Sequence, residues 1–147
     1  LFRSILVING PNMNLLGERE PEIYGSATLE ELMMWLETSP EATGHNFKFY
    51  QSNHEGQIIN TIHDERHWAQ GIIINPAAFS HYSYAIRDAI SAVNIPTVEV
   101  HLSDIYGREE FRQVSVISKI CVGRVSGLGK DSYLEGLTIL LRHIITD

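Results

Sequence analysis

The sequence predicts an α/β fold in which one domain, residues 1–147, builds a five-stranded parallel sheet between two layers of helices. Two observations support this. Short apolar runs such as SILVI and GIIIN alternate with longer segments, such as TLEELMMWLE, whose apolar residues recur at helical spacing. The alternation occurs five times along the chain. Strands that alternate with helices in this way pair in parallel through right-handed crossovers.

The first strand–helix pair combines an apolar run with a marked helix start. Residues 4–9 form the buried run, and residues 28–37 carry the helical pattern. Thr28 opens that pattern with Glu31 three residues later, which is the spacing of a capping box. In that motif each side chain accepts a hydrogen bond from the other residue's backbone N–H. The helix is therefore expected to begin at Thr28.

The second pair repeats the arrangement. Residues 46–51 alternate polar and apolar side chains as a strand does. Ser52 and Glu55 again have the spacing of a capping box, and the segment IINTIHDERHW continues at helical spacing behind them. A second helix is expected there.

Three further strands are expected in the second half of the chain. Residues 71–75 form a β-branched run that Pro76 ends, and residues 97–101 form a run that Pro96 introduces. A shorter fifth strand is expected over residues 121–125.

The remaining helical patterns cover residues 82–93 and 131–145. For five strands we favour the flavodoxin-like order 2-1-3-4-5, a three-layer sandwich with helices on both faces. Ligands of such folds bind beyond the carboxyl ends of the strands. The segments to inspect therefore start at Asn9, Asn75 and Glu99.

Composition limits the classes of partner. Apolar residues make up 44% of the chain and charged residues 20%, as in ordinary globular proteins. The formal net charge of −7 disfavours nucleic acid and anionic membranes as general partners. No apolar run approaches the roughly 18 residues of a membrane span, and the opening LFRSILVING does not have the layout of a signal peptide.

The single cysteine and the scattered histidines carry little chemistry. Cys121 cannot form a disulfide within the chain, which suits a reducing cytoplasm, and its setting ISKICVG favours a buried hydrophobe over a nucleophile. His63 and His67 are four residues apart, but HDERH is not the metal-binding motif HExxH. No metal site is expected. The other histidines set aside are His45, His54 and His143.

The loop NGPNMNLLGEREPEIYG, residues 9–25, is too long for an ordinary strand-to-helix connection of about 2–6 residues. It holds Asn12, Arg19 and Tyr24. More polar side chains follow the third and fourth strands, in NPAAFSH, EVHLS and GREEFR. These segments meet at one edge of the sheet and predict a site for a small polyhydroxylated anion.

His101 is the strongest acid–base candidate, because it falls at the carboxyl end of a strand and imidazole titrates near neutral pH. Glu99 lies two residues earlier, on the same face of an extended strand. Its carboxylate can accept a hydrogen bond from the ring and fix the tautomer.

Simpler structural roles remain open for the other polar residues. Asparagines such as Asn12 tolerate unusual turn conformations, and Tyr24 can anchor the loop. His81 can cap the helix that follows it, and Asp88 can lie on that helix's solvated face.

Taken together, the chain resembles the type II 3-dehydroquinate dehydratases, or type II dehydroquinases. The resemblance covers most of residues 5–140 in the family's order. The matching stretches are INGPNMNLLGEREPEIYG, SNHEGQIINTIH, GIIINPAAFSHYSYAIRDAI, PTVEVHLSDIYGREEFRQVS and GRVSGLG.

The resemblance implies a hydro-lyase that converts 3-dehydroquinate to 3-dehydroshikimate by anti elimination through an enolate, with no metal, Schiff base or other cofactor. It implies that Tyr24 is the base, that Arg19 helps to keep it ionised, and that His101 is the general acid. Asn12 matches the residue that helps, with a bound water, to stabilise the enolate.

The resemblance also implies a set of substrate-binding positions, in which the backbone of residues 102 and 103 takes part and the aspartate reaches in from a neighbouring subunit. These positions are Asn75, His81, Asp88, Leu102, Ser103 and Arg112. The implied assembly is a homododecamer, a tetramer of trimers, and the implied pathways are shikimate synthesis or quinate breakdown.

Elementary chemistry agrees with the role implied for the loop. A free tyrosine has a pKa of about 10, too high for a base at neutral pH, and a nearby guanidinium lowers such a pKa by roughly 1–3 units. Because Arg19 and Tyr24 share one loop, closing it as a lid would deliver both to the substrate together.

Three positions depart from the family pattern. Ala77 replaces a usual glycine, Phe79 a frequent tyrosine, and Asp104 a usual asparagine. Ala77 suggests a reshaped loop after the third strand. The negative charge of Asp104 near an anion site is expected to weaken substrate affinity.

Three other functions compete with this interpretation. A flavodoxin needs a hydroxyl-rich phosphate loop after the first strand, which NGPNMNLLG is not. A receiver domain needs an aspartate where this chain has Asn75. A binding protein descended from the enzyme would have no need to keep Tyr24, Arg19 and His101 together.

Overall fold

The computed structural model describes residues 2–104 and 109–146, with the backbone alone at Tyr24 and Thr146. The strands form one sheet in the order β2-β1-β3-β4-β5, and each neighbouring pair is parallel. The predicted flavodoxin-like α/β fold is therefore confirmed. The strands are β1 (Ser4–Asn9), β2 (Asn46–Gln51), β3 (Gly71–Asn75), β4 (Thr97–Val100) and β5 (Gly123–Val125).

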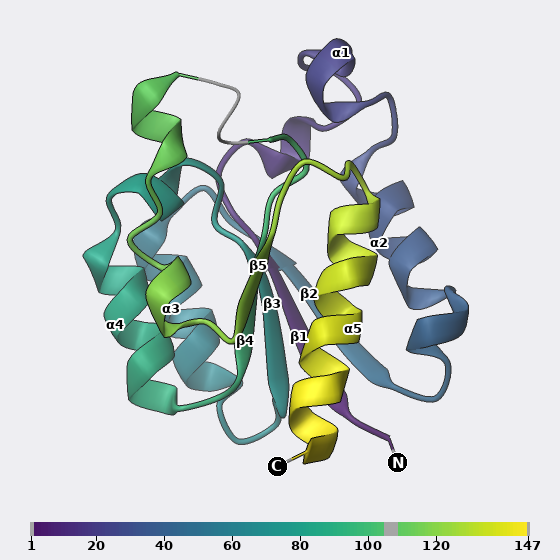
Figure 1. Cartoon of the computed structure of the whole chain (residues 1–147), viewed down its shortest axis with the longest axis vertical. Helices are drawn as coiled ribbons and strands as arrows, with labels where there is room; N and C mark the ends of the chain where they lie inside the picture. The colour runs from purple at the N-terminus through teal and green to yellow at the C-terminus, as the bar shows by residue number, and fades with distance from the viewer. Residues whose placement is uncertain (1, 105–108, 147) are drawn as a thin grey trace.

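Helices cover both faces of this sheet. Helices α2 and α5 lie on one face and α3 and α4 on the other, while α1 projects beyond the carboxyl end of the sheet (Figure 1). The helices are α1 (Pro21–Tyr24), α2 (Leu29–Glu37), α3 (Glu55–Asp64), α4 (Tyr84–Val93) and α5 (Asp131–Thr146). Along the described ranges, none of them has both the length and the apolar character needed to cross a membrane.

The core consists of two apolar clusters, one on each face of the sheet. Ile5 and Val7 of β1 join the cluster that holds Leu36 of α2. Leu6 and Ile8 point to the opposite face and join the cluster beneath α3 and α4. Alternate residues of β1 thus fill opposite layers, as the pleat of a strand requires. Each fully buried side chain of this kind contributes on the order of 2 kcal/mol.

The start of α2 has the predicted capping box. The Thr28 hydroxyl accepts a hydrogen bond from the Glu31 backbone N–H at 3.2 Å, and the Glu31 carboxylate accepts one from the Thr28 N–H at 3.5 Å. This reciprocal pair satisfies two backbone donors that the first helical turn leaves open.

The second predicted capping box, at the start of α3, is wrong. The helix begins at Glu55, and the Ser52 hydroxyl instead accepts from the His54 N–H and donates to the Gln57 side chain. The Glu55 carboxylate accepts a hydrogen bond from the Ser83 hydroxyl at 2.5 Å. A tertiary contact between α3 and the start of α4 has therefore replaced the local motif.

Three predicted boundaries shift by two residues or fewer. Helix α4 begins at Tyr84 instead of residue 82, because the Ser83 hydroxyl caps it by accepting from the Ile86 N–H. The fourth strand ends at Val100, so that His101 is the first residue beyond it, and the fifth begins at Gly123.

Candidate active site

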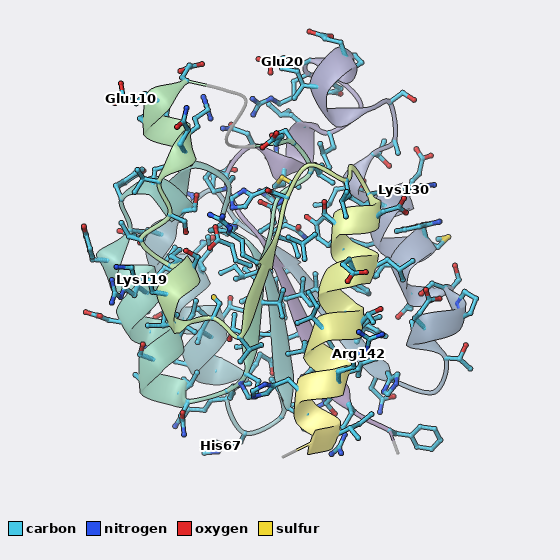
Figure 2. All side chains as sticks on the ribbon, in the orientation of Figure 1. Glu20, His67, Glu110, Lys119, Lys130 and Arg142 are labelled. Atoms are coloured by element: carbon cyan, nitrogen blue, oxygen red, sulfur yellow. The ribbon has the colours of Figure 1, made fainter. Side chains whose placement is uncertain are left out.

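A pocket opens at the carboxyl edge of the sheet, where the segments that follow β1, β3 and β4 meet. It encloses about 690 Å³, its open mouth included. Glu20 and Glu110 mark the same end of the molecule in Figure 2, whereas His67 lies at the opposite end. The lining residues are Pro11, Asn12, Met13, Leu16, Arg19, Asn75, Ala77, Ala78, His81, His101, Leu102, Ser103 and Arg112.

His101 and Glu99 form a buried pair in this pocket. The His101 Nε2 lies 2.5 Å from the Glu99 Oε2, as the sequence suggested, and the side chains are 7% and 0% exposed. The other carboxylate oxygen, Oε1, accepts a hydrogen bond from the Ser115 hydroxyl at 2.7 Å. The backbone N–H of His101 donates to the Val125 carbonyl and so ties the residue to β5. A carboxylate placed in this way holds the imidazole in one orientation.

His81 presents a second imidazole to the pocket. It ends the 3-10 helix η3 (Ala77–His81), and its Nδ1 donates to the Val114 carbonyl at 2.7 Å. Burial lowers the pKa of His81, with smaller contributions in the same direction from the positive charges of His101 and Arg112. Because Nδ1 carries the proton, the neutral ring offers Nε2 as an acceptor for a ligand hydroxyl.

Asn75 is held from below by a fully buried tyrosine. The Tyr133 hydroxyl donates to the Asn9 Oδ1 at 2.5 Å and accepts from the Asn75 Nδ2 at 3.0 Å. The Asn75 Oδ1 in turn accepts from the Ala77 backbone N–H at 3.1 Å. Burial strongly raises the pKa of Tyr133, which keeps its hydroxyl protonated as a donor. The network fixes the orientation of the Asn75 amide.

Asn12 also lines the pocket and has a left-handed conformation, with φ of 70°. Its backbone N–H donates to the Asn53 side chain at 3.0 Å. The Gln51 side chain donates to that same Asn53 oxygen and to the Gly10 carbonyl. These side chains from β2 and the loop after it therefore brace the start of the long loop.

Two arginines contribute positive charge to the pocket. Arg19 belongs to the long loop and lies 3.9 Å from the Glu20 carboxylate. Arg112 comes from the 3-10 helix η5 (Glu110–Gln113), and its guanidinium lies over the Phe111 ring at 4.7 Å. Its Nε is buried and lies 3.6 Å from the Glu109 carboxylate. The pocket as a whole can bind an anion that also carries hydroxyl groups.

The comparisons with known proteins are consistent over nearly the whole chain. Residues 3–141 match the family model for dehydroquinase class II. The chain belongs to the type II dehydroquinase family. The 3-dehydroquinate dehydratase of Caldicellulosiruptor saccharolyticus is 56% identical over 142 residues, which cover 95% of this chain and 97% of that protein. That of Trichodesmium erythraeum is 52% identical over 141 residues, which cover 96% and 94%.

A solved structure gives the same result. The crystal structure of the type II dehydroquinase from Butyrivibrio crossotus aligns with a TM-score of 0.91 at 44% identity, over 95% of this chain and 98% of that one. The resemblance identified from the sequence motifs is therefore confirmed.

Three of the predicted site residues, Tyr24, Asp88 and Glu99, are not among the described residues that line this pocket. Tyr24 ends the single turn of α1, and its side chain lies outside the part of the molecule that the structure describes. Asp88 is exposed on α4, where the family resemblance implies a role in the site of a neighbouring subunit. Glu99 lies behind His101, and the other predicted residues line the pocket.

Ala77, where the family usually has glycine, keeps a backbone conformation that suits glycine. Ala77 adopts a φ of 52°, in the left-handed region that glycine occupies without strain. The loop keeps that conformation despite the alanine side chain, because the Asn75 Oδ1 holds the Ala77 N–H.

Cys121 packs against the apolar cluster beneath α3 and α4. Burial raises the pKa of Cys121 to about 12, so this thiol is a small core side chain and not a nucleophile. Within the described ranges, no three histidine, cysteine, aspartate or glutamate side chains are grouped to hold a metal ion.

Sequence reasoning missed the two residues that support the pocket from behind. Tyr133 lies in a segment predicted as a helix, and Ser115 ends the family-matching stretch PTVEVHLSDIYGREEFRQVS, but no role is predicted for either residue. Tyr133 joins its network with Asn9 across 124 positions of sequence. A tyrosine on the buried face of a helix is a possible signal for such a network, since its hydroxyl needs a partner there.

Proposed function

We propose that this protein is a hydro-lyase that removes water from 3-dehydroquinate to give 3-dehydroshikimate, by anti elimination through an enolate. The observation that carries the proposal is the convergence of Asn12, Asn75 and His101 on one pocket with two arginines, in a chain of the type II dehydroquinase family. The printed names of its relatives are 3-dehydroquinate dehydratase.

In the first step, the Tyr24 phenolate takes a proton from the carbon next to the substrate ketone. The electron pair of that C–H bond moves to the carbonyl and forms the enolate. The Arg19 guanidinium favours the ionised tyrosine, because opposite charges stabilise one another. Asn12 lines the pocket and, with a bound water, stabilises the negative oxygen as it develops.

In the second step, the enolate collapses and expels the hydroxyl group as water. Hydroxide is a poor leaving group, so His101 gives it a proton as the C–O bond breaks. The Glu99 carboxylate, 2.5 Å from the His101 Nε2, accepts a hydrogen bond from the ring and holds its orientation. His101 is then neutral and Tyr24 protonated, and a proton transfer through solvent restores both.

Other residues that line the pocket bind the substrate in this proposal. Arg112 and the backbone N–H groups of Leu102 and Ser103 suit the substrate carboxylate. Asn75 and His81 suit its hydroxyl groups. Asp88 of a neighbouring subunit completes the set in the proposed homododecamer, a tetramer of trimers that sedimentation would detect. The long loop closes as a lid and excludes water.

The experiment that tests the proposal is an ultraviolet assay for the conjugated enone product on addition of 3-dehydroquinate. An absorbance that grows with time and scales with protein concentration is expected. A protein that binds 3-dehydroquinate but produces no enone would instead be an inactive descendant of the enzyme.

A further inference from the structure

We infer that Ser115 is a positioning residue for the proposed elimination: its hydroxyl holds the Glu99–His101 pair in the orientation in which the imidazole faces the substrate. The inference rests on the proposed function, which assigns the general acid to His101. It adds a residue that is not part of the site predicted from sequence. The evidence for this inference is the set of hydrogen bonds that the Ser115 hydroxyl makes.

The direction of the bond between Ser115 and Glu99 is fixed by the backbone. The Ser115 oxygen accepts hydrogen bonds from the Ile117 N–H at 3.2 Å and from the Ser118 N–H at 3.1 Å. A hydroxyl oxygen has two lone pairs and one proton. Both lone pairs are engaged by these donors, so the proton points to the Glu99 Oε1, 2.7 Å away.

This bond matters because the Glu99 carboxylate is fully buried. One of its oxygens lies 2.5 Å from the His101 Nε2, and the other accepts from Ser115. Removal of the hydroxyl would leave a buried carboxylate oxygen without this donor, which is costly in a low-dielectric setting. The carboxylate would then be free to rotate, and the ring that it holds would lose a fixed orientation.

The same short segment also holds the second imidazole of the pocket. The carbonyl of Val114 accepts from the His81 Nδ1, and the N–H of Val116 donates to the Ser80 carbonyl at 2.7 Å. Three consecutive residues therefore anchor the loop after β3 and, through Glu99, the residue after β4. The spacing of the two imidazoles depends on this segment.

The central test compares Ser115→Thr with Ser115→Val, which have nearly the same shape and differ in the hydroxyl. We expect the threonine variant to keep kcat within about threefold of the parent. We expect the valine variant, like Ser115→Ala, to lose about 10- to 100-fold in kcat with little change in KM. This is part of the roughly 10²–10⁴-fold that a positioned general acid contributes. Ser118→Ala is the control, because it keeps the backbone N–H that residue 118 donates to Ser115.

A second readout needs no substrate. Nitrogen-15 NMR of the His101 ring, at high pH where the imidazole is neutral, reports which nitrogen carries the proton. The parent, Ser115→Thr and Ser118→Ala should show a protonated Nε2. Ser115→Val and Ser115→Ala should show shifts averaged between the two tautomers.

The outcomes separate this inference from the proposed function. Equal kcat values for the threonine and valine variants, or an unchanged His101 tautomer in the valine variant, would overturn the role of Ser115. If the parent protein does not dehydrate 3-dehydroquinate, the proposed function fails, and the NMR comparison still decides whether the hydroxyl orients the imidazole. If the alanine variant does not fold, the threonine–valine pair carries the test.

Discussion

The hydroxyl of Tyr133 lies 3.0 Å from the side-chain nitrogen of Asn75, beneath the floor of the pocket. The tyrosine comes from α5 and is fully buried, and its own proton is donated to the Asn9 Oδ1. The helix that closes the chain thus orients an amide that the proposed mechanism uses to bind substrate.

Removal of this hydroxyl should destabilise the fold. Tyr133→Phe removes the hydroxyl that hydrogen-bonds two buried amide groups, those of Asn9 and Asn75. We expect a loss of about 1–3 kcal/mol in the free energy of unfolding, together with a higher KM. Urea denaturation measures the first effect and steady-state kinetics the second. Tyr50→Phe is the matched control, because Tyr50 is 41% exposed and its bond to Glu65 is open to water. Equal losses in the two variants would contradict the account of the buried network.

The left-handed conformation of Ala77 predicts a stabilising substitution. Ala77→Gly removes the steric strain of a side chain at a φ of 52°, and we expect a gain of up to about 1 kcal/mol. Ala78→Gly should have the opposite sign and cost about 0.5–1 kcal/mol, because residue 78 has no positive φ and glycine only adds freedom to the unfolded chain. Thermal unfolding of both variants measures the difference. The account fails if both substitutions destabilise equally.

The lowered pKa of His81 predicts a pH dependence of stability. The pKa is below 6.5 in the folded state, mainly through burial, so the unfolded chain binds more protons as pH falls through that value. The free energy of unfolding should therefore decrease from about pH 7.5 towards the folded-state pKa. His81→Asn should flatten part of this slope in urea titrations.

His45 should affect the pH dependence of the free energy of unfolding in the same direction as His81. Burial also lowers the pKa of His45, which accepts a hydrogen bond from the Arg3 backbone N–H at 3.0 Å. Substitution of both histidines should therefore flatten the slope more than either change alone. An identical slope in the parent and in His81→Asn would mean that His81 does not titrate differently on folding.

Local sequence patterns predicted the elements well where the decisive interactions are local. The strand runs and the Thr28–Glu31 capping box depend on residues close together in the chain, and both were predicted. The Ser52–Glu55 box has the same spacing but failed, because Ser83 from another helix binds the Glu55 carboxylate. Spacing alone cannot reveal such a competitor.

In the candidate site, too, the sequence predicts what depends on local pattern and strand order but not what depends on long-range packing. The carboxyl edge of a parallel sheet could be located from strand order, so Asn12, Asn75 and His101 were expected to meet, and they line one pocket. Ser115 and Tyr133 support that pocket through contacts that depend on how distant segments pack. Serine is a common residue and no local pattern predicts the role of Ser115, while the only local signal at Tyr133 is a tyrosine on the buried face of a helix.

The proposed mechanism depends most directly on Tyr24. In the proposed mechanism, proton abstraction requires the Tyr24 hydroxyl, while substrate binding depends mainly on other residues of the pocket. The most direct test is the turnover of 3-dehydroquinate by Tyr24→Phe, measured beside its equilibrium binding of the same compound. We predict that kcat falls by at least about 10³-fold while the dissociation constant stays within a few-fold of the parent value. Full activity in this variant would contradict the proposal that a tyrosinate is the base.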